Sequence, residues 1–377
     1  MKILMTTDTV GGVWEYTAEL ARALARHDVE VVLAAMGGPP RDDQRAAIEC
    51  LPSVTLHESD YRLEWMPEPW DDLNAAAEWL LDLQATEQPD LVHLNQYAHG
   101  HLPWRAPVIV AGHSCVLSWW SAVRRGPAPP DWLRYRAAVA RGLRHAGAIV
   151  APSEPMLKSL QNLYRPDAGG CLMRVIHNGR CPEDYPPGRK EPLVFASGRL
   201  WDEAKNLRML GEAAGEIPWP VFVAGPVDAP AAAAPGAEVP AGLQYLGTLG
   251  RSAMAECLGC ASIYAHPARY EPFGLGVLEA GLAGCALVLG DIPSLRTLWR
   301  DAAVFVAPDD ISGLTDALCR LAANSRTRRE LAARARRRAL TYSSHRMGTN
   351  YLALYRTLTA TAAAPRAGGR AAGAPRL

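Results

Sequence analysis

Short runs of apolar residues alternate with longer segments of helical periodicity along almost the whole chain, and this alternation restricts the fold strongly. The candidate strands of the first half are mostly apolar without interruption, as expected where helices cover both faces of a parallel sheet. They cover residues 2–8, 29–36, 54–58, 91–94, 108–113, 148–153 and 174–178. The pattern therefore predicts a doubly wound α/β domain.

A segment rich in proline and charge, Cys181–Pro192, interrupts the alternation, and a second series of strands and helices follows it. A chain of 377 residues is too long for one ordinary core and suffices for two domains. We predict one Rossmann-like domain over 1–182 and another over 183–344, with a ligand site between them. The low-complexity end, 361–377, is predicted to be disordered. The second-domain strands are expected at 193–198, 221–225, 243–246, 262–265, 286–290 and 303–306.

Charge and composition exclude several classes of protein. Basic and acidic residues number 39 each, so no overall field favours nucleic acid or an anionic membrane. No apolar run reaches the ~20 residues of a spanning helix, and the start lacks the pattern of a signal peptide, so a cytoplasmic location is expected. The segment Arg326–Arg338 carries seven arginines. It is interpreted as a solvated helix face, with contact to anionic lipid as the alternative.

Polar groups and glycines follow several strands of the first domain, at the edge where parallel sheets bind ligands. Gly11 and Gly12 precede a helix, so backbone N–H groups could approach an anion there; a tight turn is the alternative. Asn95, Gln96 and His113 end two other apolar strands. We predict that they face the acceptor side of the site, with a core role as the alternative for His113.

Two cations follow the first strand of the second domain. Arg199 stands at the strand end, and Lys205 lies at the start of the next helix. Such a pair could hold a diphosphate and neutralise the charge of a leaving nucleotide. The chain has no D-x-D motif, so fixed cations fit this task better than a metal. A solvated helix start is the simpler alternative.

The stretch "YEPFGLGVLEAGLAGCALVLG" places two carboxylates on either side of an expected helix start near Gly274. Gly274 and Gly276 are expected to leave that positive helix end open to phosphate. Glu271 and Glu279 would accept hydrogen bonds from sugar hydroxyls. The order carboxylate, phosphate site, carboxylate suits a sugar, a diphosphate and a ribose. A pair of glycosidase carboxylates is the alternative, but it needs no anion site between them.

This stretch is similar to the E-x₇-E signature of family 4 glycosyltransferases, which are retaining enzymes of the GT-B fold. Four further motifs occur in matching order, "GGVWEYTAELARAL", "APSEPMLKSL", "VIHNG" and "GRLWDEAKNL", and the resemblance covers about residues 1–360. It implies two Rossmann-like domains and a final helix, 345–360, that crosses back onto the first domain. It also implies a nucleotide-sugar donor, a carbohydrate, lipid-linked or small-molecule acceptor, and no metal or other cofactor.

The resemblance further implies a role for each residue of the site. Glu271 would contact hydroxyls of the donor sugar, and Glu279 would bind the nucleotide ribose. Arg199 and Lys205 would hold the diphosphate. The other implied contacts come from the backbone of Phe273, Gly274 and Leu275 toward sugar and phosphate, from Gly12 toward the diphosphate, and from His113 beside the sugar. Glu271, His113, Arg199 and Lys205 are therefore the expected catalytic group.

The sequence departs from the family pattern at three places. Trp14 makes the first loop bulkier, and His177 replaces a usual proline, which we interpret as structural. The turn with Ser294, Arg296 and Thr297 lacks the usual glycine pair and glutamate. Two other functions remain open, a sugar-nucleotide epimerase or hydrolase of the same fold and a non-catalytic sugar-nucleotide-binding protein. Either would differ from a transferase in a panel of sugar nucleotides tested with and without acceptors.

Overall fold

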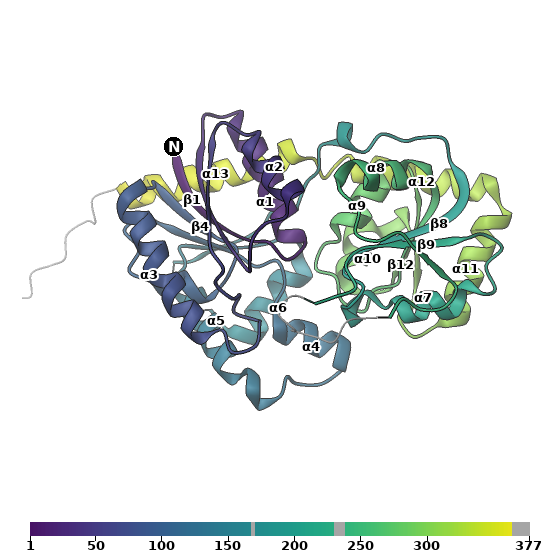
Figure 1. The fold of residues 1–377 in the computed structure, drawn as a ribbon, viewed down its shortest axis with the longest axis horizontal. Helices are drawn as coiled ribbons and strands as arrows, with labels where there is room; N and C mark the ends of the chain where they lie inside the picture. The colour runs from purple at the N-terminus through teal and green to yellow at the C-terminus, as the bar shows by residue number, and fades with distance from the viewer. Residues whose placement is uncertain (167–169, 230–237, 364–377) are drawn as a thin grey trace, which may run out of the picture.

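In the computed structural model the chain folds into two α/β domains that lie side by side (Figure 1). The structure describes residues 1–166, 170–229 and 238–363. The first domain has a seven-stranded sheet, parallel throughout, with the order β3-β2-β1-β4-β5-β6-β7. Its strands are β1 (Lys2–Asp8), β2 (Glu30–Met36), β3 (Val54–Glu58), β4 (Leu91–Leu94), β5 (Val108–Ala111), β6 (Ala148–Ala151) and β7 (Leu172–Val175).

Helices cover both faces of this sheet, and their apolar sides form two cores with it. The continuous apolar sequence of the strands is explained by this burial, since both faces of each inner strand are covered. The helices are α1 (Gly12–Ala25), α2 (Asp42–Glu49), α3 (Trp70–Glu87), α4 (Val116–Arg124), α5 (Leu133–His145) and α6 (Glu154–Tyr164).

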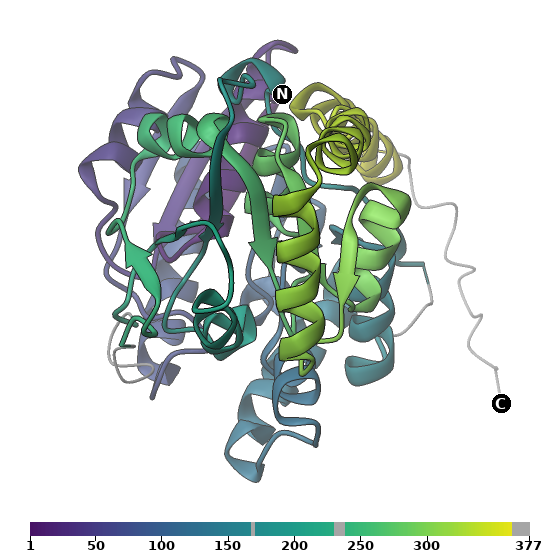
Figure 2. The same cartoon turned by 90° about the vertical axis from the view of Figure 1, so that its right-hand side faces the viewer.

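The second domain repeats the architecture with a six-stranded parallel sheet, order β10-β9-β8-β11-β12-β13. In Figure 2 this domain faces the viewer and the first domain lies behind it. The predicted α/β class with two doubly wound domains is confirmed. The strands are β8 (Glu191–Ser197), β9 (Val221–Ala224), β10 (Leu243–Tyr245), β11 (Ala261–His266), β12 (Ala286–Gly290) and β13 (Val304–Val306), and the helices are α7 (Leu207–Ala214), α8 (Arg251–Cys260), α9 (Leu275–Leu282), α10 (Pro293–Trp299), α11 (Ile311–Ala323) and α12 (Ser325–Ala339).

The last helix, α13 (Ser344–Ala363), returns to the first domain and runs along it (Figure 1). Its buried face joins the core of the first sheet through residues such as Tyr351 and Tyr355. The phenol of Tyr355 lies 2.7 Å from Nδ1 of His93, which is fully buried inside β4. The helix continues through residue 363, so the predicted disordered tail begins too early; residues 364–377 lie outside the described part of the chain.

The chain passes between the domains twice, first around Gly179 and Arg180 and again at Tyr342–Ser344, and these two crossings contact each other. The amide of Arg180 donates to the carbonyl of Tyr342, and the amide of Ser344 donates to the carbonyl of Arg180, both at 3.1 Å. A Cβ at Gly179 would lie 2.3 Å from the Ser343 carbonyl oxygen, so glycine is required at this contact. The strand expected at 174–178 lies instead at Leu172–Val175, because residues 176–178 already lead into the first crossing.

The arginine-rich helix α12 is less solvated than expected. Arg328 and Arg338 donate to the carbonyls of Leu321 and Leu298 at 2.5 and 2.6 Å, and Arg336 donates to the carbonyl of Leu282. Three of the seven arginines therefore hold α12 against the domain. Of the helices in the described ranges, none is long and apolar enough to cross a bilayer.

Candidate active site

The strand order reverses between β1 and β4 in the first sheet and between β8 and β11 in the second. Parallel α/β sheets bind ligands at the carboxyl ends of strands beside such reversals. The predicted site residues follow these four strands almost without exception. Gly11 and Gly12 follow β1, Asn95 and Gln96 follow β4, Arg199 and Lys205 follow β8, and Glu271 follows β11.

Glu271 lies in a cluster of opposite charge. Its Oε2 accepts a hydrogen bond from Nζ of Lys205 at 2.7 Å and lies 3.2 Å from Nε2 of His266. Burial alone would raise the pKa of Glu271, but the Lys205 charge and the bond to His266 hold it well below its usual range. The carboxylate is therefore ionised at neutral pH. His266 ends β11 and carries no motif of its own, so the sequence did not point to it.

The backbone of Glu271 is held by the turn in which this chain departs from the family pattern. The hydroxyl of Ser294, at the start of α10, donates to the carbonyl of Glu271 at 2.5 Å. Arg296 instead pairs with Asp291, and Thr297 bonds back to Pro293 within its own helix. Of the three divergent residues, Ser294 is thus the one that supports the site.

Arg199 reaches the loop of the opposite domain. A Cβ on Gly11 would lie 3.4 Å from Nη1 of Arg199, so the glycine loop and Arg199 are neighbours, and the φ of +109° at Gly11 favours glycine there. The other guanidinium nitrogen, Nη2, donates to Oδ2 of Asp202 at 2.8 Å. Asp202 also accepts from the indole N–H of Trp119 in α4 at 3.0 Å. One carboxylate therefore orients Arg199 and joins the two domains.

The N-terminus of α9 faces the same loop. Its capping residue, Gly274, has φ +88° and offers no side chain to the first-turn N–H groups. A Cβ on Gly12 would lie 3.7 Å from Cδ1 of Leu275, so the glycine loop and the helix start are neighbours. Gly276 was expected to keep this helix end open, but the structure gives it a packing role instead. A Cβ there would lie 2.7 Å from the Tyr264 hydroxyl, so packing requires this glycine.

The second carboxylate, Glu279, is buried in an ion pair that the sequence did not reveal. Its Oε1 accepts from Nε and Nη2 of Arg180 at 2.8 and 2.7 Å. The Arg180 side chain is only 1% exposed, and its Nη1 also donates to the carbonyl of Glu15 in α1. Burial raises the pKa of Glu279, and the Arg180 charge opposes that rise. Arg180 belongs to the first crossing, where nothing in the local sequence indicates a buried cation.

Further charges extend this ion pair across the domain interface. Glu19 of α1 is fully buried and accepts from Nη2 of Arg251 in α8 at 3.0 Å. Arg22 of α1 lies 3.2 Å from Asp184, which follows the first crossing. Helix α1 is thus bonded to the second domain and to the segment between the domains.

The polar residues after β4 and β5 hold the ring of His113 in a fixed orientation. Nε2 of His113 lies 2.8 Å from the amide oxygen of Asn95, and Nδ2 of Asn95 donates to the carbonyl of Thr6 at 2.6 Å. Asn95 therefore fixes the ring of His113 and is itself committed. Burial lowers the pKa of His113 to about 4, so the imidazole is neutral at physiological pH. Gln96 is buried, and neither atom of its amide has a partner within the described ranges.

Two family models match the chain, Glycosyltransferase Family 4 over residues 10–183 and Glycosyl transferases group 1 over residues 191–324. The chain is a glycosyltransferase of the family 4 type. The two matches fall on the two domains of this glycosyltransferase and leave out the crossing helix α13. No curated protein sequence matches it.

Solved structures of similar shape extend over nearly the whole glycosyltransferase. Sucrose-phosphate synthase from Thermosynechococcus elongatus is 20% identical, with a TM-score of 0.79 over 96% of this chain and 100% of that one. Anabaena HepE in complex with UDP-glucose is 16% identical, with a TM-score of 0.73 over 95% and 100% of the chains. WaaG, a glycosyltransferase of lipopolysaccharide biosynthesis, is 15% identical, with a TM-score of 0.68 over 94% and 99%. These likenesses show the GT-B fold.

Proposed function

We propose that this enzyme transfers a sugar from a nucleoside-diphosphate sugar to an acceptor hydroxyl, with retention of configuration and without a metal. The observation that carries the proposal is the ion pair of Lys205 and Glu271 beside the uncapped start of α9. It combines an ionised carboxylate, a cation and free N–H groups at one point. Sugar hydroxyls donate hydrogen bonds to the first, and a diphosphate binds to the other two.

Each charged group has a task in this reaction. Negative charge develops on the diphosphate as the bond from the sugar to the leaving oxygen breaks, and Arg199, Lys205 and the α9 start stabilise it. Glu271 positions the sugar through its hydroxyls. The neutral His113 lies on the acceptor side, where its unprotonated nitrogen can accept a hydrogen bond. Arg180 bonds to Oε1 of Glu279, and we assign Oε2 to the ribose.

Donor entry requires the domains to move apart, because the glycine loop already contacts Arg199 and Leu275 across the interface. The hydroxyl of Ser153 in the first domain also donates to the carbonyl of Pro272 at 2.6 Å. These contacts would re-form around the bound donor. Closure would then exclude water from the reacting sugar.

A panel of sugar nucleotides, incubated with and without acceptors, tests the proposal. UDP-glucose is the first donor to try, because structures of HepE hold it. We expect release of the nucleoside diphosphate that depends on an acceptor. NMR of the product should show an unchanged anomeric configuration, and excess chelator should leave the activity unchanged. Release of the nucleoside diphosphate without any acceptor would instead indicate a hydrolase, and conversion of the donor into an isomer without net release would indicate an epimerase. Binding without turnover of any donor would indicate a non-catalytic protein.

A further inference from the structure

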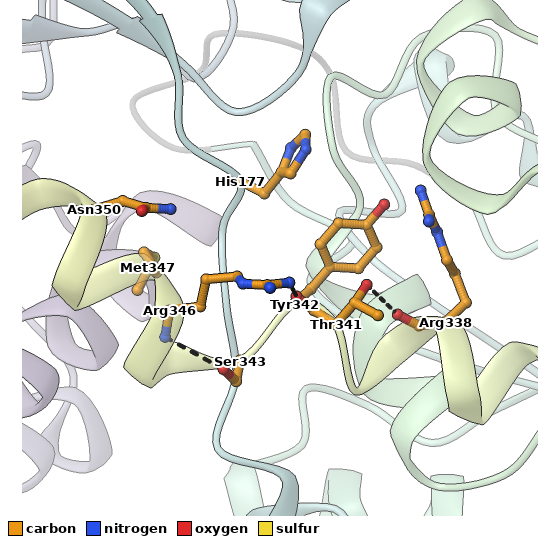
Figure 3. Close-up of a pocket in the computed structure, with 8 residues that line it drawn as sticks. All are labelled: His177, Arg338, Thr341, Tyr342, Ser343, Arg346, Met347 and Asn350. Atoms are coloured by element: carbon orange, nitrogen blue, oxygen red, sulfur yellow. Dashed lines mark hydrogen bonds between the residues drawn. The ribbon is translucent and has the colours of Figure 1, made fainter.

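A cavity of about 280 Å³ lies at the hinge where the two crossings meet. Its walls come from the first crossing, the end of α12 with the second crossing, and the first turns of α13 (Figure 3). The ring of Phe273 packs against two wall residues, His177 and Tyr342, with ring centres 6.3 and 5.7 Å apart. The cavity therefore lies behind the loop that carries Glu271, and a ligand there would contact both domains.

The walls carry positive charge that nothing neutralises in the described ranges. Arg338 uses Nε for the carbonyl of Leu298 and lies beside the ring of Tyr342, 5.2 Å from its centre. Arg346 uses Nη1 for the carbonyl of Thr341. Among the described residues, neither guanidinium has a carboxylate within ion-pair distance, and none of the wall residues is acidic. In a chain with balanced charge, such a site favours an anion.

The remaining wall residues indicate which anion. One guanidinium group can bind two oxygens of a phosphate through parallel N–H donors. Nδ1 of His177 donates to the Pro152 carbonyl at 2.8 Å, so Nε2 is left as an acceptor for a P–OH group or a sugar hydroxyl. Asn350 adds an amide suited to hydroxyls. The volume is just below the ~300–1,000 Å³ typical of small-molecule pockets. We propose that the cavity binds a compact phosphate, either inorganic phosphate or the phosphate of a small sugar ester.

The second crossing connects this cavity to the donor side. Ser343 lies in the cavity wall and pairs with Arg180, whose guanidinium holds Glu279. A phosphate that fixes Arg346 against the crossing would also fix this pairing. Its occupancy should therefore change the KM of the donor, a consequence that rests on the proposed function. The binding itself does not depend on it.

Calorimetric titration of the full chain with inorganic phosphate, and separately with a hexose 6-phosphate, tests the site. We expect saturable binding that weakens at least tenfold in Arg346→Glu and in the neutral variant Arg346→Gln. The matched control is Arg329→Glu, an exposed arginine of the neighbouring helix α12 that lies outside the cavity. A second variant, Lys205→Ala, removes a donor-side cation and should leave unchanged the binding component that Arg346→Glu removes.

Each result distinguishes the possibilities. Tighter binding of the hexose ester would identify a sugar phosphate as the ligand, and equal binding would identify free phosphate. Loss of binding in Lys205→Ala with retention in Arg346→Glu would place the anion at the donor side and overturn the proposal, as would no binding of either probe. Phosphate binding without a change in donor KM would refute the coupling between the cavity and the donor side, but not the binding site itself. An enzyme inactive with every donor would contradict the proposed function while the titration still decides the site.

Discussion

Lys205 and Glu271 stand 66 positions apart in sequence, yet their charged atoms lie 2.7 Å apart between the two strands where the second sheet reverses its order. Both side chains are largely buried, at 14% and 13% exposure. The pair has two consequences. It keeps Glu271 ionised, and it holds the Lys205 ammonium at the point where we propose that the diphosphate binds.

Replacing Lys205 with alanine should abolish most of the transfer while the fold is kept. Loss of one fixed charge that stabilises a leaving group lowers kcat by roughly 10²–10³-fold. Glu271 would keep His266 as a partner, so we expect a stability loss of about 1–3 kcal/mol rather than unfolding. Initial rates and thermal denaturation measure the two effects.

The matched control for this change is Lys158→Ala, since Lys158 is exposed on α6 and is not one of the predicted site residues. It should leave both rate and stability unchanged. Wild-type turnover in Lys205→Ala would refute the assignment of this cation to the diphosphate.

The sequence allowed Lys205 and Glu271 each to be assigned to the site, because both residues follow strands whose carboxyl ends lie at one sheet edge; their ion pair was not predicted. Continuous apolar runs also placed most strands within one to three residues. Arg180 could not be found in this way. Its partner Glu279 is 99 positions distant, and the contact depends on how the two domains pack. Likewise, the requirement for Gly276 follows from the Tyr264 hydroxyl above it, which no local pattern encodes.

Donor binding should strengthen as the pH falls through 6, because Asp8 loses its charge there. Burial raises the pKa of Asp8 to about 6, while the Val10 amide and the Arg199 charge oppose the rise. Ionised Asp8 at the end of β1 repels a diphosphate near Arg199. We expect the donor KM to fall roughly 3- to 10-fold between pH 7.5 and 5. The diphosphate diester of the donor has no proton to gain in this range.

Asp8→Asn provides the comparison for this pH dependence. It should show a low, nearly flat donor KM, since it resembles protonated Asp8 at every pH. The stability of the fold changes with pH in the same direction as the affinity for the donor. The folded pKa of Asp8 lies above its unfolded value of about 3.9, so its contribution is present at low pH and is lost as the pH rises through 6. An unaltered KM profile in Asp8→Asn would exclude Asp8 as the titrating group.

Tyr355→Phe should weaken the attachment of α13 to the first domain. The change keeps the ring in the core but removes the hydroxyl that lies 2.7 Å from Nδ1 of His93. Nε2 of His93 already has no partner within the described ranges, so the imidazole would be left without a hydrogen bond. The expected cost is about 1–3 kcal/mol in urea unfolding. Thr357→Ala, on the exposed side of the same helix, should cost little, and an equal loss in both variants would argue against the His93 contact.

Arg180→Met should be the most damaging of these substitutions, because it leaves the buried Glu279 without its cation. Removing one partner of a buried ion pair costs about 3–5 kcal/mol. Glu19 would keep Arg251 at 3.0 Å, so the interface is weakened around Glu279 rather than dissolved. Glu279→Gln in the same background removes the uncompensated charge and should restore part of the stability. The four proteins form a double-mutant cycle with an expected coupling of about 1–3 kcal/mol in urea unfolding.

The exposed pair of Arg208 and Glu212 on α7, 2.9 Å apart, supplies the matched cycle. Because water screens it, its coupling should stay near 0.3–0.5 kcal/mol. Similar couplings in the two cycles would contradict the buried ion pair between the hinge and α9. Donor kinetics separate this structural effect from a role in binding. If Glu279 also holds the ribose, the double variant recovers stability but keeps a raised donor KM, whereas a purely structural pair recovers both.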